Sequence, residues 1–177
     1  MSSNESKRQY VTVYETPWMS LKAVVSRRTG LPAYYFAERL NRDSVAILLT
    51  RNNCSEVLLR WQPMVADENN WHPCPVTGHF DVDGEDPVKC AIREVHEETG
   101  YIISAGDLRL LAMYMVGTQT NERCYLYTCD VTGIEPEEDL TDETGEEGEN
   151  RWQAVGCLLD CQYSACLIAY AFLKERN

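Results

Sequence analysis

Apolar residues occur in short runs along most of the chain, and turn-forming residues separate these runs. Val, Tyr and Leu dominate the runs, and signals such as Thr29-Gly30 and Asn52-Asn53 end them. Runs of this length between turn residues predict strands and hairpins. The three prolines between Gln62 and Pro75 predict a loop. We expect strands at Tyr10–Tyr14, Leu21–Val25, Ala33–Ala37, Val45–Thr50, Glu56–Trp61, Val76–Val82, Leu108–Val116, Glu122–Val131 and Arg151–Val155.

The clearest helical pattern runs from about Asp86 to Thr99. Pro87 stands in its first turn and Gly100 follows its end, which are the positions that these residues favour. A second helix is expected at Ser164–Arg176. Strands on both sides of one helix, followed by a closing helix, predict an α/β sandwich with a mixed sheet. The apolar residues of the first helix recur at i, i+3, i+4 and i+7, which predicts one buried face: Val88, Ala91, Ile92 and Val95.

Length and charge exclude several classes of protein. A chain of 177 residues favours one main core, and no apolar run reaches the roughly 18 residues that a membrane span needs. The N-terminus has no apolar leader segment, so we expect a cytoplasmic protein without a membrane partner. The net charge is −12, and nine of the 28 acidic residues lie between Glu135 and Glu149. Because proteins that bind duplex nucleic acid by charge are basic, we expect no such partner.

Eight cysteines are a high count for this length, and none forms a CxxC pair. A disulfide framework is typical of small secreted chains, so we expect reduced and mostly buried thiols. A zinc site built from His72, Cys74, Cys157 and Cys161 is disfavoured, because its spacing matches no usual ligand pattern.

Three carboxylates share one side of the first helix. Glu94, Glu97 and Glu98 stand at i, i+3 and i+4, and Glu85 precedes the helix at a turn. Like charges so close together repel one another unless cations neutralise them. Mg²⁺ and Mn²⁺ prefer carboxylate oxygens, and Mg²⁺ commonly shares its coordination shell with substrate phosphates. The pattern therefore indicates a site for a hard divalent cation, and a bland acidic surface is the alternative.

At this point the residues resemble a known family. Glu85, seven residues and then the run Arg93–Tyr101, which reads REVHEETGY, resemble the Nudix box. That box is Gly, five residues, Glu, seven residues, then Arg-Glu-apolar-x-Glu-Glu-x-Gly-apolar. Gly78 is the equivalent of the leading glycine, so the segment Gly78–Glu85 is one residue longer than in the family. The resemblance implies a Nudix-type α/β/α sandwich and hydrolysis of a nucleoside diphosphate linked to another group.

The resemblance also implies roles for the residues of the box. Glu94, Glu97 and Glu98 would bind Mg²⁺ or Mn²⁺ and take part in catalysis, with further metal ligands from Glu85 and the carbonyl of Gly78. Arg93 would orient the cluster. The base would be a box glutamate or one from the acidic segment, with Glu147 favoured among Glu143, Glu146, Glu147 and Glu149.

The N-terminal region resembles one branch of the family, the ADP-ribose and nucleotide-sugar pyrophosphatases. Tyr14–Trp18 and Ala33–Phe36 are similar to the strands of its N-terminal antiparallel sheet. The resemblance implies that residues 1–40 serve a homodimer and part of the substrate pocket, while residues 41–177 form the hydrolase domain. The branch has a Glu-Leu-Pro-Ala-Gly run before the box. The corresponding run here, Cys74–Gly78, reads CPVTG and lacks the glutamate, so the identity of the group linked to the nucleoside diphosphate is left open.

Other side chains are candidates for holding the substrate, because arginines bind phosphates and aromatic rings stack on bases. Two rival functions on the same fold are a nucleotide-binding sensor and an isoprenyl diphosphate isomerase, which would need Cys74, His72 and His79. The complete set of box glutamates favours the hydrolase. The candidate substrate residues are Arg51, Arg60, Arg123, Trp61, Trp71, Tyr34 and Tyr35.

Overall fold

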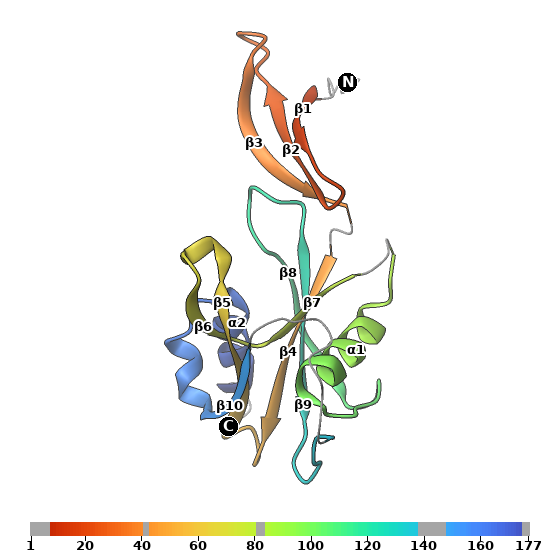
Figure 1. Ribbon diagram of the computed structural model, residues 1–177, viewed down its shortest axis with the longest axis vertical. Coiled ribbons are helices and arrows are strands. Elements are labelled where there is room, and N and C mark those ends of the chain that lie inside the picture. The colour runs from red at the N-terminus through yellow and green to blue at the C-terminus, as the bar shows by residue number, and fades with distance from the viewer. Residues whose placement is uncertain (1–7, 41–42, 81–83, 138–147, 175–177) are drawn as a thin grey trace, which may run out of the picture.

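The strands of the chain form two separate sheets (Figure 1). The computed structural model describes residues 8–40, 43–80, 84–137 and 148–174. Its smaller sheet is antiparallel, with the order β1-β2-β3, and projects away from the rest of the molecule. Its strands are β1 (Tyr10–Glu15), β2 (Met19–Val25) and β3 (Pro32–Arg39).

The larger sheet has seven strands and carries the core. Its main path is β10-β5-β4-β9-β8, with β6 paired to β5 and β7 paired to β4. The β4–β9 pair is parallel and the other pairs are antiparallel, so the sheet is mixed as predicted. Its strands are β4 (Asp43–Arg51), β5 (Glu56–Met64), β6 (Asn70–Cys74), β7 (Val76–His79), β8 (Leu108–Met115), β9 (Arg123–Asp130) and β10 (Glu149–Ala154).

The two α-helices cover opposite faces of the larger sheet (Figure 1). Successive residues of a strand point to opposite faces. Accordingly, Ile47 of β4 packs in the cluster with α1 (Pro87–Thr99), and Leu48 packs in the cluster with α2 (Ser164–Lys174). The predicted sandwich is therefore confirmed. Of the short 3₁₀ helices, η1 (Val65–Asp67) joins β5 to β6 and η2 (Val155–Leu159) joins β10 to α2, and none of the described helices is long and apolar enough to span a bilayer.

Helix α1 begins and ends where the sequence predicts. The side chain of Asp86 accepts a hydrogen bond of 2.9 Å from the backbone N–H of Val88, and Pro87 occupies the first turn. Gly100 ends the helix with a φ of 74°, a left-handed conformation that glycine adopts without strain. These two ends fix the register of the helix, and therefore the direction in which its glutamates point.

The predicted loop at Gln62–Pro75 is wrong, because most of it is a hairpin. Strand β5 continues to Met64, and β6 runs back beside it. Pro63 pairs with Trp71, and Trp61 pairs with Pro73. Among the described strands β6 pairs only with β5, and a strand with one partner tolerates proline where its missing N–H faces outward.

The smaller sheet meets the rest of the chain through β3. The backbone N–H of Ala37 donates to the carbonyl of Gln119 over 2.8 Å. The hydroxyl of Tyr34 donates to the carbonyl of Thr118 over 3.0 Å. The smaller sheet is therefore attached, through β3, to the connection between β8 and β9.

The cysteines behave as the sequence predicts. All eight lie within the described residues as free thiols, and six of them are buried. Burial is the main cause that raises the pKa of Cys74 to about 12, so this thiol stays protonated at neutral pH.

Candidate active site

Helix α1 packs against β7, and this contact brings Glu94 to Gly78. Gly78 pairs with Val45 in the middle of the sheet and is buried. A Cβ atom added at Gly78 would lie 1.9 Å from Cδ of Glu94, so residue 78 must lack a side chain for this carboxylate to stand there. The backbone of Gly78 thus forms a cradle for Glu94. This geometry favours Gly78, and not His79, as the leading glycine of the box.

Arg93 holds two of the box carboxylates and the segment before the helix. Its Nη1 lies 2.8 Å from Oε1 of Glu94 and 3.0 Å from Oε2 of Glu97. Its Nη2 donates to the backbone carbonyl of His79 over 3.2 Å. One guanidinium therefore orients the cluster and ties it to the residue after Gly78.

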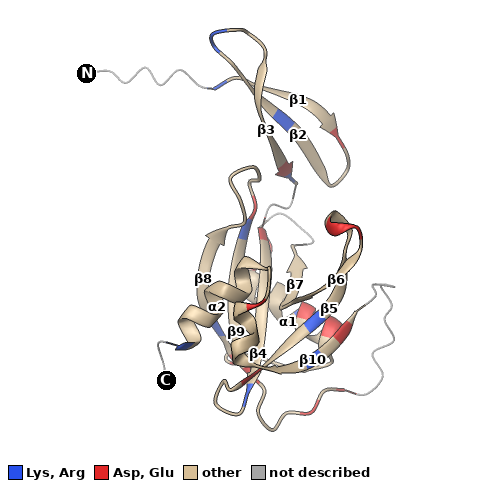
Figure 2. Ribbon diagram, turned by 90° about the vertical axis from the view of Figure 1, so that its left-hand side faces the viewer, with Lys and Arg blue, Asp and Glu red and all other residues tan. Residues whose placement is uncertain are grey.

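The third box glutamate meets a buried arginine. Nε of Arg60 lies 3.8 Å from Oε2 of Glu98, and their side chains are 9% and 13% exposed. The side-chain amide of Asn150 donates to the backbone carbonyl of Glu98 over 2.7 Å. A Cβ added at Gly148 would lie 2.5 Å from Cζ of Arg60. Strands β5 and β10 thus enclose the C-terminal end of α1, and acidic and basic residues gather there in Figure 2.

The donor atoms of this region fit a hard divalent cation. The carboxylate of Glu94 stands beside the Gly78 backbone, Glu97 and Glu98 lie on the same helix, and oxygen ligands of this kind suit Mg²⁺ and Mn²⁺. In the part of the chain that the structure describes, no group of three or more His, Cys, Asp or Glu side chains is gathered closely enough to hold a metal ion. The carboxylates contact arginines instead, so a metal ion would have to compete with Arg60 and Arg93.

Of the remaining predicted residues, the metal ligand Glu85 lies within the described residues and the predicted base does not. Glu85 is half-buried and stands two residues before α1. Glu147 lies outside the described residues, as do Glu143 and Glu146. Glu149 begins β10 and accepts a hydrogen bond of 2.9 Å from Nε of Arg151.

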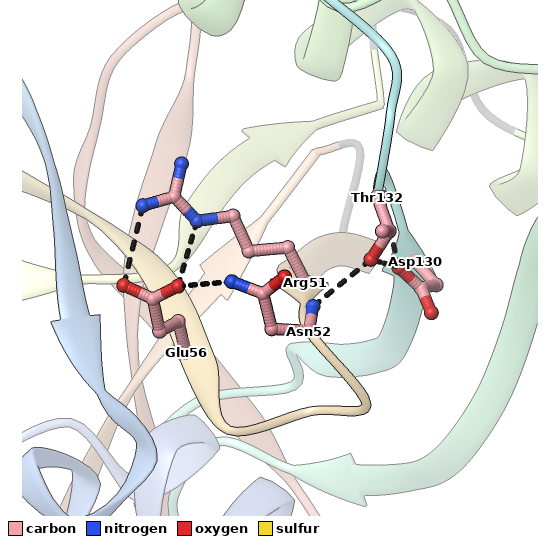
Figure 3. A network of polar contacts seen from close by, with 5 residues as sticks. All are labelled: Arg51, Asn52, Glu56, Asp130 and Thr132. Atoms are coloured by element: carbon pink, nitrogen blue, oxygen red, sulfur yellow. Dashed lines mark hydrogen bonds and ion pairs between the residues drawn. The ribbon is translucent and has the colours of Figure 1, made fainter.

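The structure does not bring Arg51 to the box. Its Nε and Nη2 donate to the two carboxylate oxygens of Glu56 over 3.0 and 3.2 Å, as Figure 3 shows. This hydrogen bonding is the main cause that raises the pKa of Arg51. Arg51 stands six residues along β4 from Val45, the partner of Gly78, which is about 20 Å at the usual rise of a strand.

The other predicted substrate residues are dispersed. Arg123 begins β9 and donates from Nε to Oδ1 of Asp43 over 3.0 Å, which raises the pKa of Arg123. Trp61 follows Arg60 on β5, so it points to the opposite face of the sheet, where Arg151 lies 5.0 Å from its ring centroid. Tyr34, Tyr35 and Trp71 are exposed, the first two on β3 and the last on β6. Among these candidates, Arg60 is the residue seen to contact a box glutamate.

A polar group that the sequence did not indicate joins the smaller sheet to the box. Glu122 has one carboxylate oxygen 3.4 Å from Nη1 of Arg39 and the other 3.6 Å from Nε2 of His79. Burial raises the pKa of Glu122, but hydrogen bonds from His79 and Ser44 and the charge of Arg39 lower it, and the net direction is down. No periodicity links these residues, since they come from four separate segments.

A cavity of about 430 Å³ lies on the smaller sheet near this junction. Its walls are mostly polar and charged, and Arg39 and Asn121 form part of them. The box residues are not in its lining: Thr12, Glu15, Thr16, Met19, Ser20, Lys22, Glu38, Arg39, Leu40 and Asn121.

Comparisons with known proteins agree with this geometry. The family model described as NUDIX domain matches residues 40–162. A solved structure described as "Crystal structure of ADP compounds hydrolase" is similar in fold, with a TM-score of 0.67 and 18% sequence identity over 96% of this chain and 94% of that chain. A comparison with curated proteins returned no significant match. Because the family model covers more than half of the chain and includes the whole box, this chain belongs to the NUDIX domain family and is a Nudix pyrophosphohydrolase.

Proposed function

We propose that this chain hydrolyses the pyrophosphate of a nucleoside diphosphate linked to a second group, of the ADP-ribose or nucleotide-sugar type. The observation that carries the proposal is the pairing of Glu94 with the Gly78 cradle on a helix that also presents Glu97 and Glu98. The products would be a nucleoside monophosphate and a phosphorylated second group. The structural likeness to an ADP compounds hydrolase supports an adenine nucleotide as the first substrate to test.

The proposed cofactor is Mg²⁺ or Mn²⁺, held by Glu94 and Glu98 with help from Glu97, Glu85 and the carbonyl of Gly78. When bound, the metal would neutralise the phosphates and lower the pKa of a bound water. The chain supplies the positions of the ligands. Arg93 keeps Glu94 and Glu97 in place over 2.8 and 3.0 Å, and Asn150 fixes the last turn of the helix at Glu98.

For the proton acceptor we propose Glu147, which lies outside the described residues. Its support is the position of its neighbours along the chain. Gly148, the next residue along the chain, lies against Arg60, which itself contacts Glu98. A carboxylate close to this contact would be able to take a proton from an attacking water.

We further propose that the chain forms a two-fold homodimer through residues 1–40, with residues 41–177 as the hydrolase domain. The smaller sheet exposes Trp18 at 80%, Tyr14 at 66% and Leu40 at 72%, which is much apolar surface for so small a sheet. Surfaces of this kind mark contacts with another chain. The eight free thiols support a cytoplasmic location.

A screen of nucleoside diphosphate conjugates with Mg²⁺ or Mn²⁺ tests the proposed reaction. Phosphate released after treatment with phosphatase reports the cleavage, and EDTA should abolish it. Glu98→Gln serves as the matched inactive variant. Failure to cleave any conjugate, by protein that binds Mn²⁺, would overturn the proposed reaction and favour a nucleotide-binding sensor.

A further inference from the structure

Arg60 is the only basic side chain among the described residues that is buried, with 8% of its surface exposed. It lies on β5 opposite Asn150 of β10, and Gly148, which precedes β10, lies against its guanidinium. Taking a guanidinium out of water is costly unless an opposite charge meets it. The position of Arg60 therefore has to be explained by its partner.

That partner is a residue of the Nudix box. Nε of Arg60 lies 3.8 Å from Oε2 of Glu98, whose side chain is 13% exposed. The thiol of Cys74 lies on the other side and donates to the carbonyl of Arg60 over 3.4 Å, but its pKa is raised to about 12 by burial, so it brings no charge. Glu98 is thus a negatively charged group that contacts Arg60.

Arg60 is also confined, unlike the other arginine of the site. The guanidinium of Arg60 fills the space that a side chain at Gly148 would need, where Cβ would come within 2.5 Å of Cζ. The side chain of Arg93 is 29% exposed and borders solvent, whereas that of Arg60 is 9% exposed. Of the two arginines, Arg60 is therefore the one that the protein encloses.

We infer that Arg60 is a built-in counter-ion that occupies Glu98 in the metal-free enzyme and competes with the metal ion for that carboxylate. This inference rests on the proposed function, since it takes Glu98 to be a metal ligand. A divalent ion on the same carboxylate would lie within about 6 Å of a confined positive charge, and like charges repel strongly where water is excluded. Arg60 therefore weakens metal binding while it stabilises the metal-free fold. It is a positioning residue, because it acts on the metal ion through Glu98, and the phosphate contact that the sequence predicts for it stays a prediction.

The test is a titration with Mn²⁺ in the absence of substrate, followed by electron paramagnetic resonance of the free ion. We expect Arg60→Gln to bind Mn²⁺ about 10-fold more tightly than the unmodified chain. In EDTA the same variant should unfold about 5–10 °C lower, because Glu98 loses its partner. Arg60→Lys keeps the charge and should resemble the unmodified chain in both measurements. Unchanged or weaker Mn²⁺ binding by folded Arg60→Gln would overturn the inference.

Two further variants keep the result decisive. Glu98→Gln must weaken Mn²⁺ binding if the proposed metal site is correct, so an unchanged affinity there refutes the proposed function itself. Weakened binding by Glu98→Gln together with unchanged binding by Arg60→Gln refutes only the role of Arg60. Should Arg60→Gln fail to fold, Arg60→Met, which keeps the bulk of the side chain without its charge, takes its place in the titration.

Discussion

Gly78 shows how one residue without a side chain determines where a box carboxylate can stand. We expect Gly78→Ala to displace Glu94, because the new Cβ would lie 1.9 Å from Cδ of that residue. Turnover should fall at least about 10-fold, and the free energy of unfolding should fall by about 1–3 kcal/mol, the usual cost of overpacking. Gly156→Ala is the matched control, since an added Cβ there meets nothing within 4 Å. Equal turnover in both variants, from steady-state kinetics, would show that Glu94 needs no cradle.

Glu98 is the residue on which the proposed chemistry depends most. If it binds the metal, Glu98→Gln should lower turnover by about 10²-fold or more, while circular dichroism still shows a folded chain. Glu68→Gln removes a charge at an exposed site between β5 and β6 and should leave turnover unchanged. Turnover near that of the unmodified chain at saturating metal would remove Glu98 from the site.

At the residue scale, the sequence identified the box but not what surrounds it. Glu94, Glu97 and Glu98 follow from a spacing of three and four residues on one helix. The contact of Arg60 with Glu98 joins β5 to α1, and the pairing of β5 with β10 brings Asn150 beside Arg60 from about 90 positions further along the chain. Repulsion among the glutamates was the expectation from sequence, yet two arginines lie among them. Such neighbours come from tertiary structure, which no local spacing encodes.

Among the elements, α1 was predictable because its signals are local. The cap at Asp86, the proline after it and the terminal glycine each act within a few residues. The β5–β6 hairpin was not predictable in the same way. Pro63 and Pro73 argue against strands. Pro73 is acceptable because β6 pairs only with β5 among the described strands, and Pro63 because the pairing of β5 with β10 stops at Trp61.

The junction between β3 and the strands of the larger sheet should depend on pH through Glu122. Its pKa lies below the ordinary value of 4.5 in the folded chain, so its ionised form stabilises the fold at neutral pH. That contribution is complete above about pH 4.5 and is lost as the pH falls through the lowered pKa. Denaturant unfolding should show Glu122→Gln less stable than the unmodified chain at pH 7, with a smaller difference at pH 3.5. A constant difference would mean that Arg39 and His79 do not favour the ionised form.

For the whole molecule, the position of the smaller sheet is the feature that sequence patterns could not give. Its strands were predicted, and the family resemblance implied a separate N-terminal antiparallel sheet, but its attachment at Thr118 and Gln119 is visible only in the structure, where Figure 2 shows the two sheets apart. Hydrophobic alternation describes one sheet at a time, and it carries no information about where two sheets meet.

The proposed homodimer depends on the exposed apolar residues of the smaller sheet. We expect light scattering at micromolar concentration to give twice the chain mass of 20.2 kDa. Deletion of residues 1–36 should leave a chain that is monomeric or insoluble, and inactive, because a small sheet with this much exposed apolar surface needs a partner. A mass near 20.2 kDa at every concentration, or full activity of the shortened chain, would contradict this view.

The two ends of the acidic segment attach to the same place on the molecule. Glu137 donates its backbone N–H to the carbonyl of Gly100 over 2.9 Å and lies 3.1 Å from His96, while Asn150 donates to the carbonyl of Glu98. A chain that leaves and returns at one point can change its length cheaply, since each doubling costs only about 0.6 kcal/mol in closure entropy. Doubling the segment between residues 138 and 147 with Gly and Ser should therefore lower the unfolding free energy by no more than that amount. Residues 138–147 are thus a part of the sequence where added length should cost the fold little, and denaturant unfolding of the lengthened chain measures that cost.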